Sequence, residues 1–298
     1  MQRELLFVVM TLLLAVCLVG AQAVQLAFKD PVGTVRWYQY EINMKGELTT
    51  AAVPQGIPLD GTVKFYASET VAGINDDGTA SIAIKAVGGT VAVMMPGLNE
   101  PMTLPTPDYT ITFKRSSTGK VTDTQIAEQS KEAKENAYQR LLLPMNDQLT
   151  SVKVMGGQGI EFPVGDIAVG VPWEDISEIE IAPGQKIAMT IVHTLQGPQT
   201  IDGSVFQQID SNTKLDIPDL TIAIEQMPPV QQTMQMQVKS SALFDPAAGE
   251  FNRTWMNGVL EMTTIAGGEQ RITVTGTFQM TGGATKMDQA PQLPVETQ

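Results

Sequence analysis

The chain has 298 residues, with 19 Lys and Arg against 32 Asp and Glu and a formal net charge of −13. A chain this acidic repels phosphate backbones, and no cluster of basic residues interrupts the acidity, so we predict no nucleic-acid partner. The single cysteine, Cys17, lies in a predicted leader, which leaves the rest of the chain without a disulfide, a zinc–thiolate site or a thiol nucleophile.

The N-terminal residues have the three parts of an export signal. Arg3 precedes an apolar run from Leu5 to Val19, and Ala21-Gln22-Ala23 places small residues where a signal peptidase reads them. The run is shorter than the roughly 20 residues of a membrane span. We therefore predict a signal peptide over residues 1–23, cleavage after Ala23, and export to the periplasm, the cell envelope or the extracellular space.

A lipid anchor is the minor alternative for this leader. Leu14-Ala15-Val16-Cys17 resembles the lipobox of bacterial lipoproteins, in which the cysteine becomes the lipidated first residue. Val16 is larger than the residue usual before that cysteine, and Cys17 lies inside the apolar run rather than at its end. An exported chain of this length buries a hydrophobic core without disulfides, which suits a bacterial envelope protein.

Most of the remaining chain alternates between apolar and polar residues, which is typical of strands. The turn at 75–78, Asn-Asp-Asp-Gly, and the glycine at 119 indicate hairpins. The predicted strands cover residues 34–48, 61–74, 79–87, 109–116, 185–195, 203–217, 230–245, 251–266 and 270–282. The predicted fold class is therefore mainly β, as a curved antiparallel sheet or an unclosed β-barrel. Two stretches rich in proline or glycine, 94–108 and 156–177, predict irregular loops.

One segment differs from the strands. Residues 123–143 are rich in the helix formers Ala, Glu, Gln, Lys and Leu, and Pro144 follows them. We predict one amphipathic helix packed on the concave side of the sheet. The residues that its apolar face would turn to the sheet include Ile126, Ala133 and Leu141.

The predicted helix divides the chain into two segments of similar pattern. In each, a strand opens with Gly-Thr-Val at 61–63 or Gly-Ser-Val at 203–205. We interpret residues 24–282 as one β-rich domain with two possible related halves, 24–122 and 145–282. Residues 283–298 are polar and contain two prolines, which predicts a disordered tail.

Two motifs carry a resemblance to known proteins. Phe-Pro-Val-Gly-Asp-Ile-Ala-Val-Gly-Val-Pro-Trp-Glu at 162–174 and the Phe-Asp-Pro-x-x-Gly turn at 244–249 are similar to elements of a group of uncharacterised exported bacterial β-rich proteins. The overall plan also resembles the bacterial lipoprotein-carrier fold, an unclosed β-barrel with a helix across its mouth and an apolar ligand cavity. The resemblance covers most of residues 28–282 and implies an apolar ligand. The chain departs from the first motif at Pro172, where a polar residue is more usual.

Candidate catalytic residues are few. His193, the single histidine, lies in a predicted strand and shares a face with Met189 and Ile191. No Gly-x-Ser-x-Gly motif or phosphate-binding loop accompanies it. We interpret His193 as a half-buried strand histidine bonded to a neighbour, and we predict no enzymatic activity and no cofactor. A cluster of His193 with two carboxylates in a cleft would favour an enzyme instead. The acidic pairs at 76–77 and 174–175 lack the spacing of a calcium loop and suit turns and solvation.

Methionine is the enriched residue, with 16 in the chain. Residues 230–239 alternate so regularly that their two methionines share one face of a strand. Thioethers suit Cu(I), but they also fill cores and line adaptable apolar surfaces. The residues that we predict to line a ligand cavity are Met189, Ile191, Met234, Met236 and Val238 from strands, and Ile126, Ala133 and Leu141 from the helix.

Three hypotheses follow for the function. We predict an exported, non-enzymatic protein that binds an apolar small molecule or lipid in a concave β-sheet cavity. The alternative is a structural or interaction domain of the bacterial envelope, with a filled core and an unknown protein partner. Copper binding through methionines comes third.

Overall fold

A computed structural model shows a mainly β protein. None of its described residues is helical, so none forms a helix that could cross a membrane. The described residues are 23–94, 97, 99–106, 108–126, 160–182, 185–222, 230–266 and 272–292.

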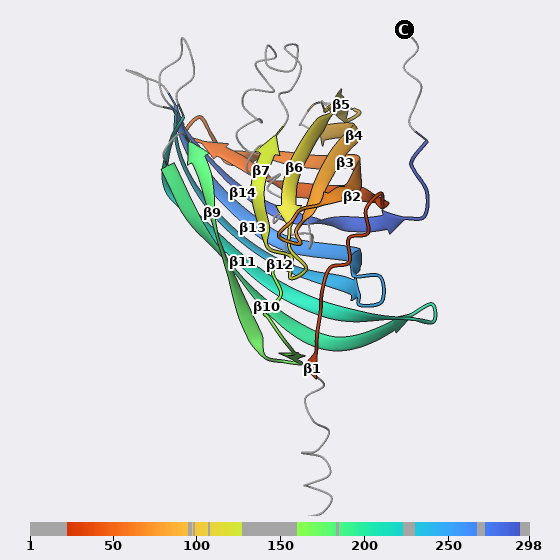
Figure 1. Ribbon diagram of the computed structural model, residues 1–298. Helices are drawn as coiled ribbons and strands as arrows, with labels where there is room; N and C mark the ends of the chain where they lie inside the picture. The colour runs from red at the N-terminus through yellow and green to blue at the C-terminus, as the bar shows by residue number, and fades with distance from the viewer. Residues whose placement is uncertain are drawn as a thin grey trace, which may run out of the picture.

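Twelve strands form one antiparallel sheet, and two short strands form a separate pair (Figure 1). The short pair joins β1 (Ala23–Val24) to β8 (Ile167–Ala168). The order in the large sheet is β7-β6-β4-β3-β2-β14-β13-β12-β11-β10-β9, and β5 pairs with β4. The strands of the large sheet are β2 (Val35–Thr50), β3 (Val53–Ile74), β4 (Ala80–Met94), β5 (Met102–Pro105), β6 (Tyr109–Arg115), β7 (Val121–Ile126), β9 (Pro172–Ala182), β10 (Gln185–Ile201), β11 (Ser204–Ile222), β12 (Val230–Asp245), β13 (Glu250–Ala266) and β14 (Ile272–Met287).

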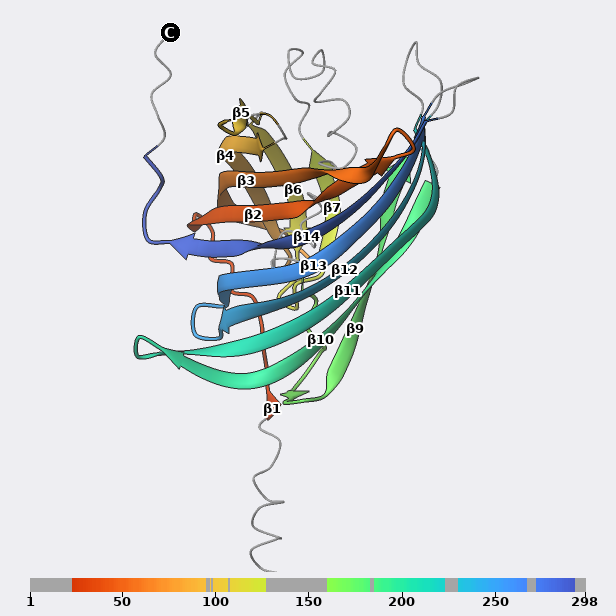
Figure 2. The same cartoon turned by 180° about the vertical axis from the view of Figure 1, so that it is seen from behind.

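Two meanders build this sheet. The first runs from β2 to β7 and the second from β9 to β14, and they join where β14 pairs with β2. Figures 1 and 2 show that the sheet curls, so that β6 and β7 lie across its concave side from β11 to β13. Strands β7 and β9 stay as separate edges. The prediction of a curved antiparallel sheet that does not close into a barrel is therefore confirmed.

The structure corrects several predicted boundaries. Strand β9 covers most of the second half of a predicted loop, and β5 lies inside the proline-rich one. Strand β3 begins at Val53 and tolerates two prolines, at 54 and 58. Strand β14 continues to Met287, past residue 282, where we placed the end of the β-rich domain. The division of the chain into two related halves stays a prediction.

The predicted helix is not found among the described residues. Its first residues belong to β7, where Gln125 and Ile126 pair with Thr112 and Ile111 of β6. Backbone hydrogen bonds to a neighbouring strand outweigh a helix propensity of a few tenths of a kcal/mol per residue. Asp123 has a φ of 55° beside a register shift in this pair, which a helix would not contain. The rest of the predicted helix, with Ala133 and Leu141, lies outside the described residues.

Three groups of buried side chains form the core. We call the first the methionine cluster: Met189, Ile191, Leu215, Ile217, Leu220, Met234, Met236, Val238, Leu260, Phe278 and Met280, with Met44, Leu48, Leu59, Met256 and Met262 packed against it. We call the second the aromatic cluster: Leu26, Phe28, Ile160, Phe162, Ile167, Leu195, Ile209, Ala242, Phe244 and Phe251. The third belongs to the first meander: Tyr38, Tyr40, Ala67, Val71, Ala80, Ile82, Ile84, Ile111, Phe113 and Ala284.

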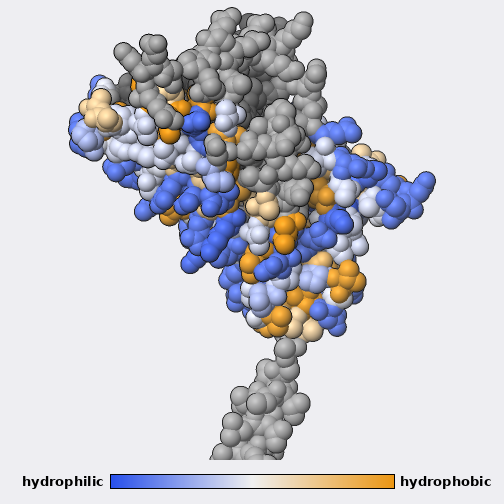
Figure 3. Space-filling model, turned by 90° about the vertical axis from the view of Figure 1, so that its left-hand side faces the viewer, coloured by the Kyte–Doolittle hydropathy of each residue, from blue (hydrophilic) through white to orange (hydrophobic). Residues whose placement is uncertain are grey.

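The outer side of the sheet is mostly polar. Along β12, residues 230–239 alternate strictly between buried and exposed. Gln231, Gln235 and Gln237 are exposed, whereas Gln232 lies on the buried side. In the view of Figure 3 hydrophilic residues cover much of the described surface, and hydrophobic ones appear in small groups. One face of the sheet therefore meets solvent while the other carries the core.

Candidate functional site

The methionine cluster unites the strand residues that we predicted to line a ligand. Met189 and Ile191 come from β10, and Met234, Met236 and Val238 come from β12, with β11 between the two strands. The alternation of each strand brings them together, because it turns every second side chain to the same face. Their role in binding stays a prediction.

Other members of this cluster were not predicted. Met236 lies opposite Leu215 on one side and Leu260 on the other, and Leu260 lies opposite Phe278. Leu215, Leu260 and Phe278 follow the same alternation as the predicted residues. The alternation within each strand therefore predicts that they are buried, but only the pairing of the strands shows that they lie in one row.

Glycine makes room for the largest side chain of the cluster. A Cβ on Gly46, which lies opposite Phe278, would come 2.6 Å from the Cδ1 atom of that ring. A Cβ on Gly276 would also come 2.6 Å from the ring, at Cε2. Phe278 therefore lies flat over two positions where any larger residue would displace it.

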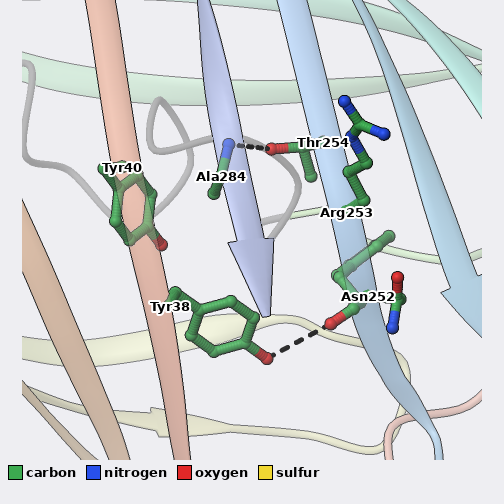
Figure 4. A pocket seen from close by; sticks show the side chains of 7 residues that line it. Tyr38, Tyr40, Asn252, Arg253, Thr254 and Ala284 are labelled. Carbon is green, nitrogen blue, oxygen red and sulfur yellow. Dashed lines mark hydrogen bonds between the residues drawn. The ribbon is translucent and has the colours of Figure 1, made fainter. Parts of the chain in front are cut away.

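A small crevice lies between β2, β13 and β14. The crevice in Figure 4 is too narrow to enclose a water molecule, and it lies outside the methionine cluster. Two hydrogen bonds join its walls. The Tyr38 hydroxyl donates to the Phe251 carbonyl, and the Ala284 N–H donates to Thr254 Oγ1. Ligand pockets for drug-sized molecules usually hold about 300–1,000 Å³, so this crevice is too small for an acyl chain. The residues that line it are Tyr38, Tyr40, Phe251, Asn252, Arg253, Thr254 and Ala284.

A row of polar side chains crosses the buried face beside the methionine cluster. We call it the polar belt: Asp175 of β9, His193 of β10, Ser211 of β11 and Ser240 of β12. His193 lies opposite Ser211, and Ser211 lies opposite Ser240. Asp175 is on the same face as Trp173, the residue opposite His193.

His193 is more deeply buried than we predicted. Its side chain is 1% exposed, and its Nδ1 atom lies 2.7 Å from Ser211 Oγ in a hydrogen bond, which confirms the predicted bond to a neighbour. The ring of Trp173 packs 5.3 Å from the imidazole, and its Nε1 donates to the carbonyl of Glu161. Trp173, from the motif at 162–174, thus covers the histidine. Asp175 was predicted to be solvated and is buried instead.

A second polar group, which the sequence did not predict, lies at the other end of the buried face. We call it the ion cluster: Asp30, Arg36, Glu69, Arg115, Glu250 and Lys286. Arg115 contacts both Asp30, at 2.7 Å, and Glu69, at 2.9 Å, while its guanidinium carbon lies 4.5 Å above the ring of Phe28. Arg36 binds the same two carboxylates and also Glu250, which pairs with Lys286.

The ion cluster pairs three acidic with three basic side chains, and this pairing shifts the pKa values of Glu69 and Arg115. Burial alone would raise the pKa of Glu69, but attraction and hydrogen bonds from Arg115 and Arg36 outweigh burial and lower that pKa. Burial alone would lower the pKa of Arg115, but Glu69 and Asp30 outweigh it and raise that pKa. The ionised forms of Glu69 and Arg115 are therefore favoured in the folded protein, and the ion cluster ties five strands to the segment before β2.

The side chains that most often bind metals in proteins do not support a metal site in the described part of the chain. The described part of the chain contains no group of three or more His, Cys, Asp or Glu that could hold a metal ion. Copper binding through thioethers stays a prediction, since methionine is not among those ligands. The turn at 75–78 is confirmed as local chemistry, because Asp77 Oδ1 accepts hydrogen bonds from the N–H and hydroxyl of Thr79.

Among the comparisons with known proteins, only the one with solved structures finds a likeness. No family model matches the chain, and no curated protein matches its sequence. A solved structure that describes lipid–protein interactions in lipovitellin is similar, with a TM-score of 0.47 and 8% identity over 90% of this chain. This chain spans 27% of that lipovitellin chain. A likeness at this level carries no argument about function, and the resemblance to the lipoprotein-carrier fold stays a prediction.

Proposed function

We propose that this protein is an exported, non-enzymatic binding protein that holds the apolar chain of a lipid or small molecule on its methionine cluster. The observation that carries this proposal is the gathering of methionines from five strands on one face of the sheet. Four of them are buried and three are partly buried: Met189, Met234, Met236 and Met280, then Met44, Met256 and Met262.

The chemistry of methionine supports an adaptable binding surface. Its unbranched side chain has three rotatable bonds and a polarisable sulfur, so a group of methionines can repack around chains of different shape. A sheet that does not close can also admit a ligand without breaking its ladder of hydrogen bonds. Apolar contact would supply the affinity, at about 25 cal/mol for each Å² removed from water.

A filled core is the second candidate. The buried members of the methionine cluster already pack against one another, and the crevice between β2, β13 and β14 lies outside this cluster. In that case the protein would act as a structural or interaction domain of the cell envelope.

Native mass spectrometry of the purified mature protein separates the two candidates. Ligand binding predicts a co-purified lipid or the uptake of a fluorescent fatty-acid analogue at one equivalent. A bare mass with no uptake would support the filled core, and a bare mass with stoichiometric copper would support the third hypothesis.

Strand β12 offers a matched pair of variants for this assay. Met236→Gln places an amide of similar length on the methionine cluster, whereas Gln235→Met makes the reverse change on the exposed side of the same strand. We expect the first variant to lose uptake and the second to keep it, with circular dichroism showing a folded sheet in both. Equal uptake by the two variants would contradict the proposed face.

Export has its own test. The mature chain should begin at Val24, which packs against the aromatic cluster, so cleavage after Ala23 would leave that contact in place. Intact-mass analysis of protein from fractionated cells checks this. Retention of residues 18–23 behind a lipidated Cys17 would favour the lipid anchor.

A further inference from the structure

We propose that the polar belt binds the uncharged, hydroxyl-bearing head of an amphipathic ligand whose apolar chain lies on the methionine cluster. The inference rests on the proposed function and adds the class of ligand to it. It starts from the place of Asp175, His193, Ser211 and Ser240 on the buried face.

The belt lies at a boundary between two apolar regions. On β10 the buried residues run Met189, Ile191, His193 and Leu195, so the histidine separates the methionine cluster from the aromatic cluster. Ser240 separates Val238 from Ala242 in the same way on β12. A ligand chain that follows the methionines would thus end at the belt rather than at another apolar group.

The burial of the belt points to a purpose beyond solvation. His193, Ser211 and Asp175 are 1%, 8% and 5% exposed, although the buried positions beyond the belt on β10 and β11 are apolar. The hydrogen bond between His193 and Ser211 offsets the cost of burying these two side chains, but an aliphatic residue would avoid that cost altogether. His193, Ser211 and Ser240 instead place polar side chains at the same level on three neighbouring strands, and Asp175 lies one position further along the same face, opposite Ile191.

The chemistry of the belt selects one kind of head group. The serine hydroxyls can donate and accept, and the imidazole does both in its neutral form. A ligand hydroxyl can both donate to a serine hydroxyl and accept from one. A carboxylate can only accept, and its charge would be buried beside a belt that contains no lysine or arginine, which costs free energy. We therefore expect a glycerol-type head to bind and a fatty-acid head of equal chain length to be disfavoured.

Two probes of equal chain length test this inference on the mature protein. A twelve-carbon monoacylglycerol and the twelve-carbon fatty acid share the chain and differ in the head. Titration calorimetry at pH 7 should give a dissociation constant for the monoacylglycerol about tenfold lower, the effect of one or two discriminating hydrogen bonds. The fluorescence of Trp173, which packs on His193, should change with the first probe.

Serine variants on the two faces of the sheet isolate the belt. Ser211→Ala and Ser240→Ala should bring the two dissociation constants to within about threefold, while the fatty-acid value stays unchanged. Ser241→Ala is the control, because Ser241 lies on the other face and bonds to Asp210. Thermal melts identify any variant that fails to fold. If Ser211→Ala does not fold, Ser240→Ala alone tests the inference.

The outcomes separate this inference from the function on which it rests. If neither probe binds, the proposed function fails. If both bind equally well and the serine variants change neither value, the apolar binding stands and the belt only stabilises the fold. If the fatty acid binds more tightly, the head-group inference is overturned.

Discussion

The two ends of the buried face are built on opposite principles. At one end, the rings of Phe28, Phe162, Phe244 and Phe251 contact one another, with centroid distances from 5.0 to 6.5 Å, and the ion cluster lies beside them. At the other end, the methionine cluster forms the core, and its methionine side chains each have three rotatable bonds. Aromatic rings and paired charges allow one arrangement, whereas thioethers allow many of similar energy.

This difference assigns stability to one end and adaptability to the other. The aromatic end holds the segment before β2, through backbone bonds from the Phe28 N–H to Ser117 and from the Lys29 N–H to Gly249. The methionine end consists of long neighbouring strands without such a crossing segment among the described residues. Mutations at the aromatic end should therefore lower the free energy of unfolding by a large amount, and mutations at the methionine end should lower it by a small amount.

The largest effect is expected at Arg115. Arg115→Ala would leave Asp30 and Glu69 buried with part of their partner charge removed, which should lower the free energy of unfolding by about 3–5 kcal/mol. Urea denaturation of the mature protein measures it. Lys64→Ala is the control, because the exposed pair of Lys64 with Glu41 should contribute only about 0–1 kcal/mol. Similar losses for the two variants would show that the ion cluster is not the anchor of the fold.

A pair of core mutations compares the two ends directly. Phe244→Ala removes a ring that is 0% exposed and should cost about 3–5 kcal/mol. Met236→Leu keeps the volume and should cost less than about 1.5 kcal/mol. The same denaturation assay compares them. A methionine variant as costly as the phenylalanine variant would mean that the methionine cluster is as rigid as the aromatic one.

Gly249 tests the attachment of the segment before β2. Its φ is 69°, and an added Cβ would lie 2.4 Å from the backbone nitrogen of Lys29. Gly249→Ala should cost more than about 1 kcal/mol. Gly78→Ala has a similar φ of 80° with nothing within 4 Å, so it measures the backbone strain alone. Thermal melts measure how much more Gly249→Ala destabilises the protein than Gly78→Ala does, and this difference reports the contact with Lys29. Equal destabilisation by the two variants would contradict that contact.

Acid should weaken the same end by a smaller amount. The pKa of Glu69 is lowered on folding from its ordinary 4.5, so the unfolded chain takes up this proton first as the pH falls. The stability that Glu69 contributes is complete above about pH 4.5 and is lost as the pH falls through the lower, folded pKa. Glu69→Gln should flatten this part of the stability curve, measured by urea denaturation from pH 6 to pH 3. A curve of unchanged slope would assign the acid sensitivity to other carboxyls.

The sequence alone predicted what depends on neighbours in the chain. A period of two along residues 230–239 places Met234, Met236 and Val238 on one buried face, because each side chain follows from the pleat of its own strand. The turn at 75–78 was predictable for the same reason, since Asp77 bonds to Thr79. These local rules do not say which faces meet.

The tertiary structure alone decided the contacts between distant strands. Arg36 and Glu250 are 214 residues apart and pair because β2 and β13 flank β14. Gln125 and Ile126 form strand because β6 supplies hydrogen bonds that outweigh a helical composition. His193 is buried because β9 and β11 bring Trp173 and Ser211 beside it. No local pattern contains these partners, because their proximity comes from the pairing order of the sheet.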